Sequence, residues 1–453
     1  MSGKADTLQR RSRWAWYFYD FGNSAYASII LLAVFSSYFK NVIVPTVHLA
    51  DGTTSNAYGT SLWGISVGIA AIVVALISPV LGTIADFSRY KKRFLSIFTI
   101  LSVLFTALLF FVREGDVFTG MLFFILAEIG YRASQVFYDA LLADVSTPET
   151  INEISGRGWA VGMVGGIVAL LVVLVPIQLI GNDVIPFAFI FCAVFFLVSA
   201  LPAFLWVKEK QVAEGLPKDK TVISHAFSNL ARTFRSVRSY KEFIKYTVSF
   251  LIYNDGIMML MDFAAIIGGT LYGLNQTQLI ILVVILQITG ALGALLFGRI
   301  ASRKSGKIAV MISLIMLIIT IGAIFFIPSD MIWFFVVGAF AGFSLSGAQA
   351  VSRGLVVQLA PEDKTAEFYG FLSVAGRTST FIGPFVFGTL THRMSNWYVN
   401  NGYGGDLAEK YGTLWGIGSI IAFLLIGGIL LIFVRGLGTG KRIDLSNTPE
   451  ESV

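Results

Sequence analysis

Ionisable side chains occur inside several long apolar stretches of this 453-residue chain. The first stretch, residues 14–39, contains Asp20, Asn23 and Ser24. A carboxylate at membrane depth is costly unless a partner or an aqueous cavity satisfies it, and such residues mark solute or proton pathways. Residues 14–39 therefore predict a membrane-spanning helix that lines a pathway.

A later apolar stretch, residues 117–143, carries a polar face. Its members recur at i, i+4, i+7 and i+11, which places them on one side of a helix; they are Glu128, Arg132, Gln135 and Asp139. Glu128 and Arg132 are spaced to pair near the middle of the span. Asp139 lies roughly 7 residues, or about two turns, beyond Arg132 toward one end of the span. We expect its depth in the membrane to be comparable with that of Asp20. This face cannot contact lipid, so we expect it to face a cavity.

The second half of the chain repeats this polar pattern. It places Asn254, Asp255, Asp262, Gln349, Arg353 and Arg377 within apolar stretches. Two interpretations stay open: these charges are structural ion pairs between helices, or they bind solute and ions. Burying ion pairs gains little stability after desolvation, which favours the functional interpretation.

Composition indicates the class of protein that holds these residues. Hydrophobic residues make up 56% of the chain and charged residues 13%, against about 25% charged in soluble domains. The chain is therefore expected to be an all-α integral membrane protein. One cysteine and three histidines predict no disulfide, no metal site and no cofactor. No catalytic or nucleotide-binding motif is evident, so we do not expect an enzyme.

Stretches long enough to cross a bilayer predict twelve spans. They are residues 14–39, 61–85, 94–112, 117–143, 158–180, 184–207, 244–270, 276–300, 308–327, 331–358, 368–391 and 413–434. Lysine and arginine concentrate in the loops on the side of the N-terminus, and the positive-inside rule then puts both termini in the cytoplasm. The net charge of +6 follows from this topology and predicts no nucleic-acid partner.

One long polar stretch divides the spans into two sets of six. The expected regions are a cytoplasmic tail, a first half, a linker, a second half and a second tail, at residues 1–13, 14–207, 208–243, 244–434 and 435–453. Phe227, Leu230, Phe234 and Val237 give the linker an apolar stripe flanked by basic residues. This pattern predicts an amphipathic helix lying on the inner leaflet.

The two halves show weak internal repetition. Tyr19 to Gly22 in span one corresponds to Tyr253 to Gly256 in span seven, and Gly82 to Ala85 corresponds to Gly298 to Ala301. Many transporters are built from such repeats. The matches occur in the same order and topology, which predicts two parallel-repeat six-helix halves.

These features resemble the major facilitator superfamily. The resemblance rests on Gly82 to Asp86 leading into a basic loop that ends at Arg93, and the run from Tyr19 to Tyr26 is similar to the Atg22/UMF1 branch, whose fungal members are vacuolar amino-acid effluxers. Phe87 and Ser302 depart from the wider superfamily pattern. The resemblance implies a gating loop with a second copy, made of Gly82, Asp86, Arg89, Lys92, Gly298 and Arg303.

The expected function is secondary active transport of a small solute by alternating access, in a monomer. The resemblance implies an amino acid or similar small polar metabolite, and coupling to protons is a hypothesis that rests on carboxylates in low dielectric. A transporter-like receptor or sensor without turnover is the alternative. The resemblance also implies the inner membrane of a bacterium or the vacuolar membrane of a fungus. The candidate substrate or coupling residues are Asp20, Asn23, Tyr26, Glu128, Arg132, Gln135, Asp139, Tyr253, Asn254, Asp255, Gln349, Arg353 and Arg377.

Overall fold

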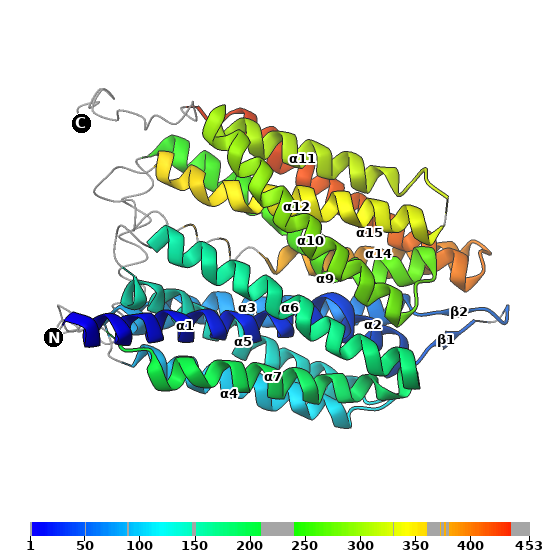
Figure 1. Cartoon of the computed structure of the whole chain (residues 1–453). Helices are drawn as coiled ribbons and strands as arrows, with labels where there is room; N and C mark the ends of the chain where they lie inside the picture. The colour runs from blue at the N-terminus through cyan, green and yellow to red at the C-terminus, as the bar shows by residue number, and fades with distance from the viewer. Residues whose placement is uncertain are drawn as a thin grey trace. The chain divides into compact units, whose positions relative to one another are not determined.

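The computed structural model is almost entirely helical (Figure 1). It describes residues 2–49, 51–87, 90–146, 151–209, 240–328, 330–359, 372, 376 and 380–435. Eleven helices in this described part are long and apolar enough to cross a membrane. The expected all-α membrane fold is therefore confirmed. The predicted linker helix falls almost wholly on residues outside the described part.

The chain forms two compact units, made of residues 1–228, 259–284 and 381–417, and of residues 229–258, 285–380 and 418–453. The predicted division into six-helix halves and the cytoplasmic position of the termini stay predictions. Elements that lie wholly in the first unit are α1 (Ser2–Tyr26), η1 (Ala27–Ala33), α2 (Phe35–Tyr38), η2 (Phe39–Ile43), β1 (Val47–His48), β2 (Thr54–Ser55), α3 (Ala57–Phe87), α4 (Lys91–Leu108), η3 (Leu109–Phe111), α5 (Val117–Val145), α6 (Ile151–Ile180), η4 (Asn182–Val184), α7 (Ile185–Trp206) and α14 (Ile382–Asn400).

The second unit contains α11 (Gly306–Ala323) and α12 (Met331–Leu359). Three further helices contribute residues to both units: α9 (Lys241–Tyr272), α10 (Gln276–Arg303) and α15 (Gly405–Ile432). Most helices match the predicted spans closely, but α14 continues to Asn400 and α15 begins eight residues before the predicted span (413 − 405). Hydropathy locates only the part of a helix that fits the hydrocarbon layer, so polar helical extensions beyond it escape prediction.

The first span is not a uniform α-helix. After α1, the segments η1 and η2 are π-helical, with backbone hydrogen bonds from Val34 N to Ile29 O at 2.9 Å and from Val44 N to Phe39 O at 3.0 Å. Each bond spans five residues instead of four. Short π-helical segments are uncommon and often occur at functional sites. The wider turns change which side chains of this span point into the protein.

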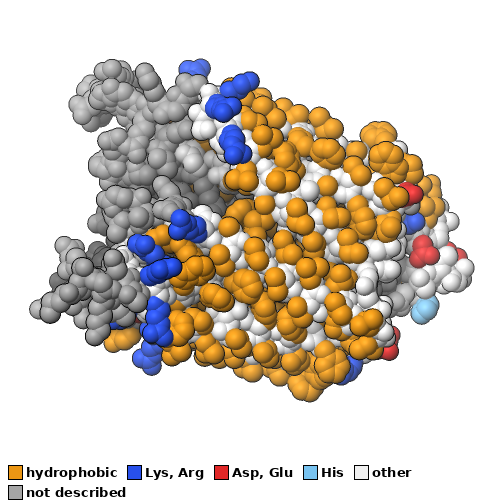
Figure 2. Space-filling view, viewed as in Figure 1, with side chains coloured by type: hydrophobic (Ala, Val, Ile, Leu, Met, Phe, Trp, Pro, Cys, Tyr) orange, Lys and Arg blue, Asp and Glu red, His pale blue; other side chains and the backbone are white. Residues whose placement is uncertain are grey.

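Close helix packing holds the first unit together. The helix α1 packs against α6 and α7, while α4 packs against α5 and α7. A Cβ added at Gly165 of α6 would overlap the carbonyl group of Phe21 in α1, so only glycine allows this approach. Figure 2 shows hydrophobic side chains over much of the visible surface, and Leu179 of α6 is 80% exposed. Such apolar exposure suits a surface that faces lipid.

The same tyrosine contact occurs once in each unit. In the first unit, the Tyr19 hydroxyl donates to Ser134 Oγ of α5 at 2.9 Å. In the second unit, a hydrogen bond of 2.7 Å joins the Tyr253 hydroxyl and Ser352 Oγ of α12. Both tyrosines are fully buried. Tyr19 and Tyr253 are the residues that the sequence repeat pairs, so the repeat corresponds to an equivalent helix-to-helix contact.

Candidate functional site

A buried ion pair lies in the middle of α5. Arg132 Nε donates to Glu128 Oε1 at 2.5 Å across one helical turn. The Glu128 side chain is 0% exposed and that of Arg132 is 20% exposed. Glu128 Oε2 is buried and has no hydrogen-bond partner among the described residues. The spacing predicted this pair, and its burial leaves one carboxylate oxygen able to accept a further bond.

A second carboxylate, that of Asp262 in α9, lies within electrostatic range of both Glu128 and Arg132. Asp262 is 6% exposed. Trp63 of α3 donates its indole N–H to the Asp262 backbone carbonyl at 2.9 Å, which fixes this part of α9 against α3. Together with Glu128 and Arg132, Asp262 therefore forms a cluster of two acids and one base. The sequence showed Asp262 as an intramembrane acid, but its proximity to Arg132 depends on helix packing.

Aromatic rings cover this cluster. Tyr26 of α1 stacks on Tyr131 of α5 with 4.4 Å between ring centroids and 22° between planes. Gln135 lies one helical turn after Tyr131 on α5, and its side chain is near the Tyr131 hydroxyl. The Tyr26 hydroxyl lies beside Glu128, yet it is buried without a hydrogen bond of ordinary geometry to any described residue. Tyr26 of α1 thus lies beside the polar face of α5 that carries Glu128, Arg132 and Gln135.

Asp20 and Asn23 lie on α1 at the contact with α6. Asn23 Nδ2 donates to Asp20 Oδ1 at 3.4 Å, and a Cβ added at Gly162 would lie 2.6 Å from Asp20 Oδ2. Asp139 of α5 is exposed. Both carboxylates act electrostatically on Tyr19. The expectation that Asp20 faces Asp139 or an arginine across a cavity stays a prediction.

The candidates of the second unit are described only in part. Tyr253, Asn254 and Asp255 are buried in α9, while Gln349 of α12 is half-buried. Tyr253 holds α9 to α12 through its hydroxyl. The side chain of Arg353 and all of Arg377 lie outside the described residues. The arginines expected in this half therefore stay predictions.

The predicted gating loop is also described in part. Gly82 and Asp86 fall within α3, but the Asp86 side chain and the whole of Arg89 lie outside the described residues. Gly298 and Arg303 are exposed on α10. Lys92 donates from Nζ to the Val207 carbonyl at 3.0 Å.

A contact that the sequence did not reveal adjoins this loop. Glu209 accepts from the backbone N–H groups of Lys91 and Lys92 at 3.2 and 3.0 Å, so its carboxylate caps the N-terminus of α4. Lys91 Nζ also pairs with Asp144 of α5 at 3.0 Å. A carboxylate at a helix N-terminus is stabilised by the helix dipole. These contacts join the end of α7, the start of α4 and the end of α5.

A known protein family matches this chain over most of its length. The family model for vacuole effluxers of the Atg22-like type matches residues 8–400. The chain belongs to the Atg22-like family. An uncharacterized MFS-type transporter, YxiO of Bacillus subtilis (strain 168), is 26% identical over 93% of this chain and 94% of its own length. Autophagy-related protein 22 of Coccidioides immitis (strain RS) is 22% identical over 86% of this chain and 75% of its own length.

Solved structures show the fold of this Atg22-like chain. A bacterial homologue of the human lysosomal transporter Spinster, inward-facing and unoccupied, aligns with a TM-score of 0.68 at 14% identity over 95% of this chain and 97% of that one. The nucleoside transporter NupG (D323A mutant) aligns with a TM-score of 0.68 at 14% identity over 93% and 99%. The family match, the MFS-type relative and this fold together make the protein a multi-pass membrane transporter of the major facilitator type and not an enzyme. Its bacterial and fungal relatives fit both membranes named from the sequence.

Proposed function

We propose that the Atg22-like chain moves a small zwitterionic solute, of the amino-acid class, by alternating access. The observation that carries this proposal is the buried cluster of Glu128, Arg132 and Asp262, which offers both signs of charge at the centre of a span. The unpartnered Glu128 Oε2 suits a solute ammonium, and the Arg132 guanidinium suits a carboxylate. The description of the matching family, vacuole effluxer, supports export of a solute and names no cargo.

The remaining candidates take supporting roles in this proposal. Tyr26 and Tyr131 form a wall against which a small solute packs, and the Tyr26 hydroxyl supplies a further polar atom. Asp20, Asp139 and Asp255 are the carboxylates proposed to lie along the pathway. Arg353 and Arg377 are proposed as further anion-binding groups from the second half. Each assignment follows from the residue type and its place in an apolar span.

Proton coupling is proposed through the Glu128 and Asp262 carboxylates. Two acids beside one base leave one negative charge uncompensated within the cluster. Uptake of a proton would neutralise this charge. Release of the proton on the other side of the membrane would restore it. Uptake into proteoliposomes should then depend on pH between pH 5 and 8, whereas a flat profile contradicts coupling.

The test begins with ligand identification. Purified protein is heated with amino acids, peptides, sugars or nucleosides, because a ligand that binds the folded state raises the midpoint of unfolding. Amino acids should raise it, and the active one should then support counterflow of radiolabelled solute in proteoliposomes. A shift with nucleosides or sugars alone would remove the amino-acid proposal. Binding without counterflow would favour a receptor that does not turn over.

Glu128→Gln and Arg132→Met are the variants that test the site. Both should abolish counterflow while the protein stays folded. Lys245→Gln is the matched control because Lys245 also belongs to a salt bridge within one helix, but its side chain is 47% exposed. Lys245 lies on the same helix as Asp262, about 25 Å from it along the helix axis, since 262 − 245 is 17 residues. This control should transport like the parent.

A further inference from the structure

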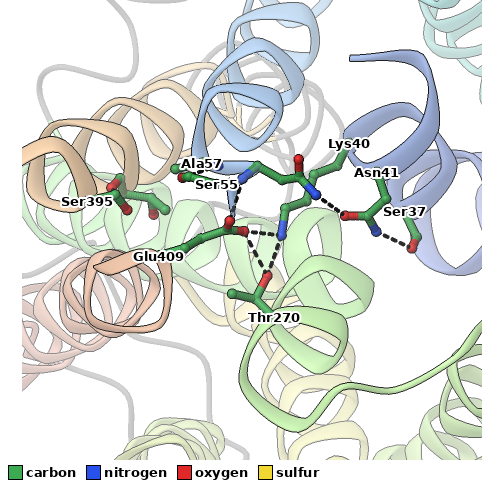
Figure 3. Close-up of polar contacts among 10 residues, drawn as sticks. Ser37, Lys40, Asn41, Ser55, Ala57, Thr270, Ser395 and Glu409 are labelled. Atoms are coloured by element: carbon green, nitrogen blue, oxygen red, sulfur yellow. Dashed lines mark hydrogen bonds and ion pairs between the residues drawn. The ribbon is translucent and has the colours of Figure 1, made fainter. Parts of the chain in front are cut away.

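A second buried charge cluster lies in the first unit, apart from Glu128 and Arg132 (Figure 3). Lys40 Nζ of η2 pairs with Glu409 Oε1 of α15 at 2.5 Å, with side chains 4% and 8% exposed. Lys40 also donates to Thr270 Oγ1 of α9. Lys40 directly follows the predicted first span, residues 14–39. Its ammonium group is buried even though it lies at the end of that apolar stretch.

Both carboxylate oxygens of Glu409 are engaged. Oε1 meets Lys40 and also accepts from Thr270 Oγ1 at 3.5 Å. Oε2 accepts from the backbone N–H of Asn56, immediately before α3, at 2.6 Å. A carboxylate at this position also interacts favourably with the N-terminal dipole of α3. Glu409 therefore connects η2, α3, α9 and α15 at one point.

Neighbouring contacts join the same segments. The backbone N–H of Gly405, at the start of α15, donates to Thr53 Oγ1 beside β2 at 2.5 Å. Gln276, at the start of α10, donates to the Ala33 carbonyl at the end of η1 at 2.7 Å. By the predicted topology, spans one and two belong to one half of the transporter, and spans seven, eight and twelve belong to the other half. Each of these contacts therefore joins a segment of one predicted half to a segment of the other.

The helices pack tightly next to this cluster. A Cβ added at Gly388 of α14 would lie 3.0 Å from the Thr60 carbonyl oxygen and 3.1 Å from Ser61 Cα of α3. Ser61 is only 7% exposed. Close backbone contact between α3 and α14 thus accompanies the ion pair at this end of the first unit.

A buried ion pair is a weak source of stability, because desolvation of both charges offsets their attraction. Its two groups regain hydration once they separate into water. An apolar contact has no such compensation, since separation exposes its surface to water. A charged contact therefore keeps closed and open arrangements closer in free energy than an apolar contact of equal size.

We propose that Lys40 and Glu409, with Thr270 and Asn56, form an outer latch that closes the pathway on the side opposite the termini. The latch breaks when that side opens to exchange solute with the medium. This proposal rests on alternating access as proposed above, and it assigns the latch residues no contact with solute.

The test measures accessibility and needs no substrate. Ser61→Cys is introduced as a reporter in a Cys192→Ala background, since Cys192 is the single cysteine of the chain and is buried. The rate of modification by a membrane-impermeant maleimide is measured in proteoliposomes. Lys40→Gln and Glu409→Gln should each raise this rate about tenfold, because each leaves a buried charge without its partner and shifts the population toward the open state.

Two further variants sharpen the expectation. The reversed pair Lys40→Glu with Glu409→Lys should give an intermediate rate, because it restores the attraction but cannot accept the Asn56 N–H. Thr270→Val removes only the hydroxyl and should raise the rate by about twofold, which corresponds to about 0.5 kcal/mol, the lower end of the range for one hydrogen bond. This milder change keeps the proposal testable if the charge variants fail to fold.

Asp406→Asn and Lys410→Gln are the matched controls, since both residues are exposed neighbours of Glu409 on α15. In both controls, the Ser61→Cys reporter should be modified at the parent rate. An unchanged rate in folded Glu409→Gln and Thr270→Val proteins, or an equal rise in the controls, overturns the latch. Because the readout is chemical modification, it reports on the latch even in a protein that fails every transport assay, so failure of the amino-acid proposal and failure of the latch can be told apart.

Discussion

The Glu128 and Arg132 pair predicts an asymmetric loss of stability when either member is removed. Arg132→Met leaves Glu128, which is 0% exposed, without its 2.5 Å partner and beside Asp262, a like charge. We expect this variant to lose about 3 kcal/mol, the lower end of the range for breaking buried pairs, because the Arg132 side chain is 20% exposed. Glu128→Gln leaves Arg132 with Asp262 and should lose only about 1 kcal/mol.

The double variant measures how strongly Glu128 and Arg132 are coupled. Glu128→Gln with Arg132→Met leaves no buried carboxylate at residue 128, so it should lose about 2 kcal/mol, which is less than the sum of the single losses by about 2 kcal/mol. The free energy of unfolding is measured by denaturant titration of the detergent-purified protein, followed by circular dichroism. Counterflow of the identified solute is measured on the same variants.

A surface pair provides the control. Lys245 and Glu242 pair at 2.7 Å with side chains 47% and 29% exposed, and removing Lys245 should cost at most about 1 kcal/mol. Additive losses at residues 128 and 132, or a loss at Lys245 as large as that of Arg132→Met, would refute the electrostatic reasoning. If the double variant regained transport along with stability, the pair would be a structural contact and not part of the site.

Three other changes test the packing of the protein. Tyr253→Phe should cost about 1 kcal/mol in unfolding free energy, because it removes the hydrogen bond between the Tyr253 hydroxyl and Ser352; an unchanged unfolding midpoint would count against this contact. Gly165→Val should lower the yield of folded protein in size-exclusion chromatography, since its Cβ would overlap the Phe21 carbonyl; a parental elution profile would contradict the close approach. Glu209→Gln should cost about 0.5 kcal/mol through the weaker cap of α4, and this loss should shrink in high salt, which the same titration measures.

Much of the fold follows from the sequence because a bilayer imposes simple lengths and polarity. The apolar stretches located the spans, and the spacing of Glu128 and Arg132 alone predicted their pairing within one helix. The burial of Lys40 could not be predicted in this way. Hydropathy treats a lysine at the end of a span as a loop charge, while its partner Glu409 lies near the other end of the chain.

The candidate site shows the same division between local and long-range information. Tyr26 and Asp20 were visible as polar groups in an apolar span, but their neighbours depend on how α1 packs against α5 and α6. Asp262 became a member of the charge cluster only through the packing of α9, fixed in part by Trp63. Periodicity assigns a residue to a face of its helix, and it carries no information on which helix lies opposite.

The π-helical segment η1 has a consequence for how this chain tolerates changes of length. A π-helical turn holds one more residue than an α-helical turn, and each residue of an α-helix advances by about 100° around the axis. Deleting a single residue between Ala27 and Ala33 would let the segment relax to an ordinary α-helix, while every residue beyond it kept the helical phase that it has now. A substitution to alanine at the same site would retain the extra residue and the wide turn. Length and composition therefore act separately in this span, and a single-residue deletion should be tolerated better in η1 than in the regular helix α1.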